Sequence, residues 1–118
     1  MTTFVVHSRE DIAQAKACAP HAALTTTADA ACYLGNALLQ LWQEDAAPQP
    51  LLVGCGANAA MAYDALCVGL RDVYVHAPQP MMVKLRAIAA TQGARIHEDY
   101  PRDAVDMRAS GWEKQTSE

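Results

Sequence analysis

The sequence lacks two features that would indicate a nucleic-acid or membrane protein. None of its nine lysines and arginines are adjacent, and acidic residues outnumber them to leave a net charge of −4. A phosphate backbone is bound by clustered basic side chains, so nucleic acid is not an expected partner. No apolar stretch reaches the about 20 residues that a membrane-spanning helix needs, so membrane association is not expected either.

The sequence also lacks closely spaced cysteine pairs. Its four cysteines are Cys18, Cys32, Cys55 and Cys67, and no two of them form a C-x-x-C motif. The N-terminal residues enter an apolar strand pattern directly, without a basic segment typical of a signal peptide. Reduced thiols in a cytoplasmic protein are therefore expected. Three of the cysteines fall on alanine-rich helical stretches and are predicted to be small core residues, whereas Cys55 differs.

Charged residues are few, and the apolar residues recur in alternating strand and helix patterns. The strand patterns cover residues 4–7, 22–26, 51–53, 73–76 and 94–97. The helix patterns between them cover residues 8–19, 27–44, 58–69 and 78–93. Residues 1–97 are expected to form one domain, and residues 98–118 a polar C-terminal tail or docking arm with Met107 and Trp112 as its apolar anchors.

Strand–helix alternation at this spacing predicts a mostly parallel sheet with right-handed crossovers. The expected fold class is α/β, a small doubly wound (Rossmann- or flavodoxin-like) sheet of about five strands with helices on both faces. A flavodoxin-like strand order of 2-1-3-4-5 is one such arrangement. A complete eightfold barrel is excluded, because it needs about 200 residues or more.

The most specific motif follows the third predicted strand. Gly54-Cys55-Gly56-Ala57-Asn58-Ala59 fits G-x-G-x-x-[GA] between a strand and a helix, which is the setting of a dinucleotide-binding turn. The fourth strand ends at His76, where that motif expects a carboxylate, so a nicotinamide cofactor is not predicted. A small anionic ligand at this edge of the sheet, or a plain tight turn, are the alternatives. The candidate ligand residues are Ser8, Thr26, Thr27, Gly54, Gly56 and Asn58.

Cys55 is a candidate nucleophile, because a thiol at the start of a helix can be acidic. His7 or His76 would act as its base if strands one, three and four are neighbours. The alternative is that Cys55 fills a crowded turn, and that both histidines are structural. Other thiol and metal chemistries do not fit: position 61 is methionine rather than arginine, position 58 is not cysteine, and no paired metal ligands occur. Neither a metal nor a cofactor is expected, and the enzyme hypothesis is the weaker one.

Large apolar side chains exceed what a small sheet needs for its core, which favours self-association. They are Tyr33, Trp42, Tyr63, Met81 and Met82. Some of them are expected on an exposed patch. Substitution of Trp42 or Met82 by aspartate is expected to weaken an oligomer if those side chains face a partner. A homo-oligomer is therefore the expected partner.

The chain resembles small uncharacterised bacterial α/β proteins in three places. These are Ala30-Ala31-Cys32-Tyr33-Leu34-Gly35, the cysteine–glycine turn, and Ile88-Ala89-Ala90-Thr91-Gln92-Gly93-Ala94. The resemblance implies an α/β fold and no activity. The leading hypothesis is a self-associating domain that binds a small anionic ligand near Gly54-Cys55-Gly56. The alternatives are an enzyme that uses Cys55, and a pure assembly subunit.

Overall fold

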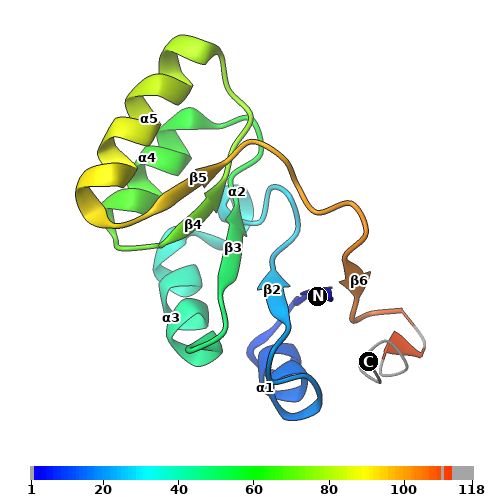
Figure 1. The fold of residues 1–118 in the computed structure, drawn as a ribbon. Coiled ribbons are helices and arrows are strands. Elements are labelled where there is room, and N and C mark those ends of the chain that lie inside the picture. The colour runs from blue at the N-terminus through cyan, green and yellow to red at the C-terminus, as the bar shows by residue number, and fades with distance from the viewer. Residues whose placement is uncertain (1, 110, 113–118) are drawn as a thin grey trace.

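Six parallel strands form one sheet in the order β5-β4-β3-β2-β1-β6 (Figure 1). The computed structural model describes residues 2–109 and 111–112 of the chain. The strands are β1 (Thr3–Val5), β2 (Ala23–Thr25), β3 (Leu51–Gly54), β4 (Asp72–Tyr74), β5 (Arg95–His97) and β6 (Val105–Asp106). The predicted α/β class with a parallel sheet is confirmed, with six strands where about five were expected.

Five helices connect the strands. They are α1 (Arg9–Cys18), α2 (Ala31–Leu34), α3 (Asn36–Ala46), α4 (Ala59–Cys67) and α5 (Gln79–Gln92). The side chains of Ser8 and Asn58 cap α1 and α4 by accepting backbone N–H bonds, because they satisfy donors that have no partner inside the helix. The single helix predicted over residues 27–44 is wrong. It is divided into α2 and α3 at Gly35, whose φ of 85° does not continue a helix.

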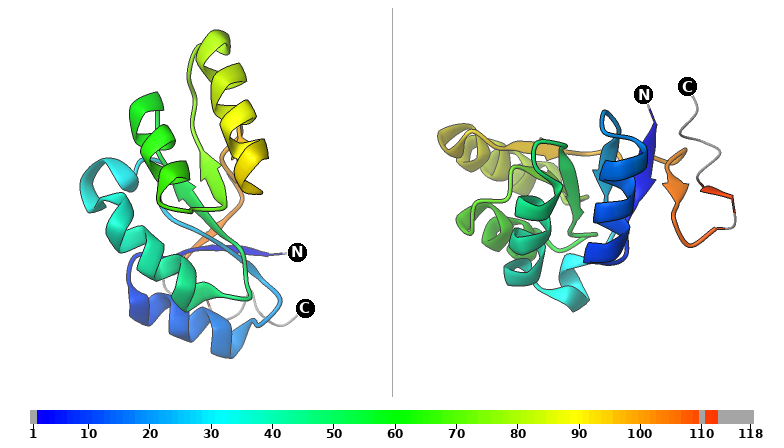
Figure 2. Two further views of the ribbon diagram at one scale, coloured as in Figure 1. Left: turned by 90° about the vertical axis from the view of Figure 1, so that its left-hand side faces the viewer. Right: turned by 90° about the horizontal axis from the view of Figure 1, so that it is seen from below.

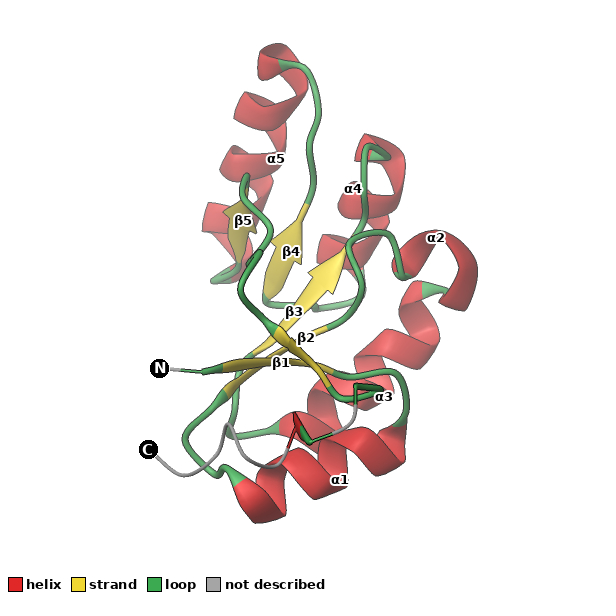
Figure 3. Cartoon of the chain, turned by 90° about the vertical axis from the view of Figure 1, so that its right-hand side faces the viewer, coloured by secondary structure: helices red, strands yellow, loops and turns green. Residues whose placement is uncertain are grey.

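The helices cover one face of the sheet. Contacts join α1 to α3, α3 to α4, and α4 to α5, and Figure 2 and Figure 3 show these helices together on one side. The strand order explains this, because β1 to β5 follow one another in a single direction. Right-handed crossovers in one direction place every helix on the same side. The flavodoxin-like order of 2-1-3-4-5 would reverse direction and divide the helices between two faces, and the structure differs from it in this respect.

The core lies between the helices and this face of the sheet. Phe4, Leu24 and Leu51 are aligned across three neighbouring strands, and Val53 and Val73 across the next pair; all five are at most 2% exposed. Trp42 and Met82 pack in the same core. These two side chains therefore cannot face a partner, whereas Tyr33, Tyr63 and Met81 are the members of the predicted set that are exposed.

The prediction that three cysteines are small core residues is wrong, whereas the burial of Cys55 agrees with the alternative that it fills a crowded turn. Cys55 is fully buried, whereas Cys18, Cys32 and Cys67 are exposed and none of the four forms a disulfide. The helices that carry the three exposed cysteines turn them to the outer surface. Alanine occurs at nearly every turn of these helices. Because it is small and apolar, its positions did not indicate which face of each helix would be buried.

The segment after β5 returns across the opposite face of the sheet and adds β6 beside β1 (Figure 3). Met107 is buried, and the Trp112 ring packs edge-on against Phe4 with 5.7 Å between ring centroids. On the way, the Tyr100 hydroxyl donates to the Thr26 carbonyl at 2.6 Å. The two apolar residues named as anchors thus contact the same domain. Among the described helices, none is both long and apolar enough to cross a membrane.

Candidate functional site

The Gly54-Cys55-Gly56 turn uses its backbone donors within the protein. The N–H of Gly54 donates to the Thr26 hydroxyl at 2.9 Å, that of Cys55 to the Tyr74 carbonyl at 2.8 Å, and that of Gly56 to the Ala28 carbonyl at 2.8 Å. An anion-binding turn needs such N–H groups to point at the ligand. These three donors are already occupied, so the turn does not present them to an anion.

Packing against the preceding loop accounts for both glycines. A Cβ atom on Gly54 would lie 2.2 Å from the Thr27 carbonyl oxygen and 2.5 Å from the Ala28 carbonyl carbon. A Cβ on Gly56, whose φ is +58°, would lie 3.2 Å from Cβ of Asp29. The motif that resembles a dinucleotide-binding turn is therefore suited to the close approach of residues 27–29.

Cys55 lies beneath this loop and is fully buried. Burial raises the pKa of its thiol to about 12, because a thiolate is poorly solvated there. Cys32 lies nearby and directs its Sγ to the Cys55 carbonyl oxygen at 3.5 Å. A nucleophilic cysteine needs an acidic, accessible thiol, and this environment favours the alternative that Cys55 fills space in the core.

The two candidate histidines are not arranged around Cys55 as the sequence hypothesis required. Strand β2 separates β1, which precedes His7, from β3, which precedes Cys55. His76 follows the neighbouring strand β4, but it is exposed while the Cys55 thiol is buried. The backbone N–H of His76 donates to the Gly56 carbonyl at 2.8 Å, so its link to the turn is through the main chain.

His7 instead pairs with the returning C-terminal segment. Its Nε2 lies 2.6 Å from Oδ1 of Asp106, and its backbone N–H donates to the Asp11 carboxylate at 2.8 Å. The His7 side chain is 10% exposed. Two contacts on different elements therefore fix the imidazole at the carboxyl end of β1, which is the edge where parallel sheets bind ligands.

A small cavity of about 90 Å³ lies beside His7, at the carboxyl ends of β1 and β2. Its polar lining residues are His7, Thr27, Tyr33 and Arg108, and its apolar lining residues are Val6, Ala30, Leu34 and Trp42. The hydroxyl groups of Thr27 and Tyr33 lie 2.6 Å apart and share one hydrogen bond. Polar groups from four separate segments thus converge on one enclosed space.

The charge state of Asp106, the partner of His7, is set by its neighbours. The backbone N–H of Arg108 donates to its Oδ1 at 2.9 Å, and this bond, with the His7 side chain, holds the pKa of Asp106 below its usual value. Asp106 is therefore a carboxylate at neutral pH. It fixes His7, and the neighbouring Arg108 adds a positive charge to the lining of the cavity.

The remaining predicted ligand residues have structural contacts. Ser8 and Asn58 cap helices, and the buried Thr26 hydroxyl donates to the Thr27 carbonyl at 2.8 Å while it accepts from Gly54. Of the predicted residues, the structure brings only His7 and Thr27 to the cavity. Tyr33, Asp106 and Arg108 were missed as site residues, since nothing in the sequence showed that residues 105–108 return to β1.

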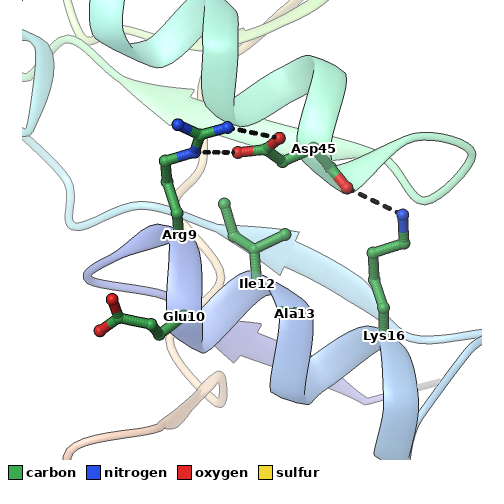
Figure 4. A pocket seen from close by; sticks show the side chains of 6 residues that line it. All are labelled: Arg9, Glu10, Ile12, Ala13, Lys16 and Asp45. Atoms are coloured by element: carbon green, nitrogen blue, oxygen red, sulfur yellow. Dashed lines mark hydrogen bonds and ion pairs between the residues drawn. The ribbon is translucent and has the colours of Figure 1, made fainter.

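A shallow groove between α1 and α3 has a volume of about 530 Å³ (Figure 4). Three of its charged residues bond one another: Arg9 makes two bonds to the Asp45 carboxylate, at 2.5 and 3.1 Å, and Lys16 Nζ donates to the Asp45 carbonyl at 2.8 Å. The pair lowers the pKa of Asp45, because the Arg9 guanidinium donates to it. These groups link two helices on the surface, so the groove is a weaker candidate than the smaller cavity.

In the part of the chain that the structure describes, no three histidine, cysteine, aspartate or glutamate side chains are grouped to hold a metal ion. Comparison of the chain with models of known protein families, with curated proteins and with solved structures gave no match. The geometry of the molecule is therefore the basis for the functional proposal.

Proposed function

We propose that this domain binds a small anion, such as a phosphate or a carboxylate, in the cavity between His7, Thr27, Tyr33 and Arg108. The convergence of these four side chains at the carboxyl edge of the sheet carries the proposal. It moves the predicted anion site from Gly54-Cys55-Gly56 to the neighbouring strand ends. Open α/β sheets bind ligands at this edge.

The volume of the cavity limits the ligand. About 90 Å³ corresponds to roughly three water molecules, at about 30 Å³ each in the liquid. An inorganic phosphate or a carboxylate group matches this size, whereas binding pockets for larger ligands start at about 300 Å³. A nucleotide would have to leave most of its atoms outside, which agrees with the lack of a dinucleotide-binding turn.

The lining supplies three kinds of recognition. Arg108 provides positive charge, and its guanidinium can bond two oxygens of one anion. The Thr27 and Tyr33 hydroxyls can each donate to an oxygen by giving up their mutual bond. His7 is held by Asp106 through Nε2. The cavity therefore offers an imidazole held in place and two hydroxyls beside a cation.

Binding without catalysis fits the chemistry better than the enzyme alternative. The Cys55 thiol is buried, and β2 separates its strand from the strand before His7. The Thr27 and Tyr33 hydroxyls in the cavity bond one another, and His7 pairs with Asp106. An assembly subunit with an empty cavity is the remaining alternative, and it predicts no effect of any anion.

Calorimetric titration with phosphate, sulfate and acetate, together with thermal unfolding at each anion concentration, tests the proposal. At least one anion is expected to raise the melting temperature. Arg108→Ala and Thr27→Val are expected to weaken binding by roughly tenfold each, as for the loss of hydrogen bonds to a charged group. Arg102→Ala is the matched control, because Arg102 is an exposed arginine of the same segment outside the cavity.

Two results would overturn this function. One is that no anion changes the melting temperature or gives a binding isotherm. The other is that Arg108→Ala and Arg102→Ala weaken binding equally, because that would reflect the loss of overall charge rather than of a specific site.

A further inference from the structure

Within residues 2–109 and 111–112, no helix lies over one face of the parallel sheet. Val5, Thr25, Leu52, Asp72 and Arg95 are aligned in one row across five strands on this face. The helices pack on the opposite face (Figure 2, Figure 3). Purely parallel sheets occur almost only with both faces covered, so this open face is an exception that needs a covering partner.

The returning segment covers only the carboxyl half of this face. Its Tyr100 ring packs edge-on against Tyr74, with centroids 5.5 Å apart, and its hydroxyl bonds the Thr26 carbonyl. In the aligned row, Val5 and Thr25 are buried, Leu52 and Asp72 are half-buried and Arg95 is exposed, so burial on this face decreases from β1 to β5. The contacts of Tyr100 lie at the carboxyl ends of β2 and β4, so they leave the amino half of the sheet uncovered.

A hollow of about 370 Å³ lies on that uncovered half. Its apolar floor and rim include Ala23, Pro50, Leu52, Tyr100 and Pro101. Removing apolar surface of this kind from water is favourable in free energy. The hollow therefore favours an occupant with apolar side chains at its centre.

Charged groups of both signs border the same hollow. Asp72 is already paired with His97 at 2.9 Å. Arg95 and Asp99 both line the hollow and are exposed, and neither forms an ion pair with another described residue. This patch therefore has one unpaired cation and one unpaired anion around an apolar centre. Two copies of it can face one another with opposite charges in contact.

We infer that a second copy of this chain packs on the open face, in a two-fold dimer that joins Arg95 of each copy to Asp99 of the other. A two-fold interface brings the same patch of both copies together, which requires this self-complementarity. A different protein that binds through opposite charge would instead require an excess of one sign of charge on this patch. The inference is independent of the anion cavity, which lies at the other end of the strands.

Sedimentation equilibrium or light scattering of the full chain over a concentration series tests the interface. Leu52→Glu is expected to raise the dimer dissociation constant by roughly tenfold or more, because it places two like charges in the apolar centre. Val83→Glu is the matched control: Val83 is 63% exposed on the helix α5, on the opposite face. It should leave the dissociation constant unchanged.

A charge exchange separates the dimer from an effect within one chain, and it uses exposed residues that do not contribute to the core. Arg95→Asp and Asp99→Arg are each expected to be monomeric at concentrations where the natural chain is dimeric. An equal mixture of the two variants should form dimers again, because every facing pair then has opposite charges. Circular dichroism confirms that each variant is folded.

Three outcomes would overturn the inference. The first is that the natural chain has the mass of a monomer at all concentrations up to about 1 mM, where even a weak dimer would form. The second is that Val83→Glu, rather than Leu52→Glu, dissociates the dimer. The third is that the mixture of charge variants stays monomeric, which would place the interface elsewhere.

Discussion

Nε2 of His7 and Oδ1 of Asp106 lie 2.6 Å apart, although 99 positions separate the two residues in the sequence. The pair joins the carboxyl end of β1 to β6, and it connects the fold to the candidate site. Because Asp106 is about half exposed, the pair is screened by water. Its contribution to the free energy of unfolding is therefore expected to be below about 1 kcal/mol.

The lowered pKa of Asp106 predicts how this contribution depends on pH. A carboxyl with a lowered pKa in the folded state stabilises the fold above its unfolded pKa, about 3.9, and loses this effect as the pH falls through the folded value. Asp106→Asn is thus expected to be less stable than the natural chain at pH 6, with the difference shrinking at about pH 3. Urea unfolding at both pH values measures it. A difference that grows at low pH would contradict the assignment.

The four cysteines are predicted to differ in reactivity according to their burial. Cys18, Cys32 and Cys67 are exposed and should react with iodoacetamide in the folded protein, whereas the buried Cys55 should not. Because burial raises the pKa of Cys55 to about 12, little thiolate forms there even at pH 9. Mass spectrometry of the labelled peptides measures each site.

Unfolding in urea is the control for that experiment, since all four cysteines should then react. Rapid modification of Cys55 in the folded protein at neutral pH would contradict the burial argument. It would also restore the hypothesis that this thiol is a nucleophile.

Gly54→Ala is predicted to destabilise the fold strongly. Its Cβ would lie 2.2 Å from the Thr27 carbonyl oxygen, a backbone atom that cannot turn away. The loss in the free energy of unfolding should be at least about 2 kcal/mol. Gly69→Ala is the control: its φ is +94°, but nothing lies within 4 Å of the added atom. It should cost about 1 kcal/mol. Equal losses for the two variants in urea unfolding would contradict the close approach of the loop.

Local patterns in the sequence were sufficient for most elements of the fold. Ser8 and Asn58 have the side chains and spacing that cap helices, and both do so. The helix pattern predicted over residues 78–93 stops at Gly93, and Gly93 follows the end of α5 in the left-handed conformation that glycine readily adopts. Such signals act within a few residues, so sequence periodicity and capping are enough to detect them.

Strand order and the candidate site depended on contacts that local patterns do not encode. His7 stood at the end of a predicted strand, but its partner Asp106 lay in a segment without periodicity. The direction in which β2 adds to β1 decides which strands are neighbours, and no residue in either strand specifies it. The distance between His7 and Cys55 could therefore not be predicted, and the proposed site moved to the cavity lined by Thr27 and Tyr33.

Tyr100 is predicted to fasten the returning segment to the sheet. Its hydroxyl donates to the Thr26 carbonyl at 2.6 Å, while its ring packs on Tyr74. Tyr100→Phe keeps the ring and removes the bond, so it should cost about 1 kcal/mol of unfolding free energy. Tyr100→Ala removes both contacts and should cost more. Hydrogen exchange of residues 98–106 should accelerate in both variants, and exchange in α4 should change less.

The same side chain predicts a loss of stability in alkali. Burial raises the pKa of Tyr100, so the folded state keeps its hydroxyl proton at a pH where the unfolded chain loses it. The stabilisation is complete below the unfolded pKa of about 10 and declines as the pH rises through the folded value. Tyr100→Phe has no such proton, so its stability should fall less steeply above about pH 10 than that of the natural chain. Parallel declines in the two proteins would show that the Tyr100 hydroxyl is not held in the folded state as described.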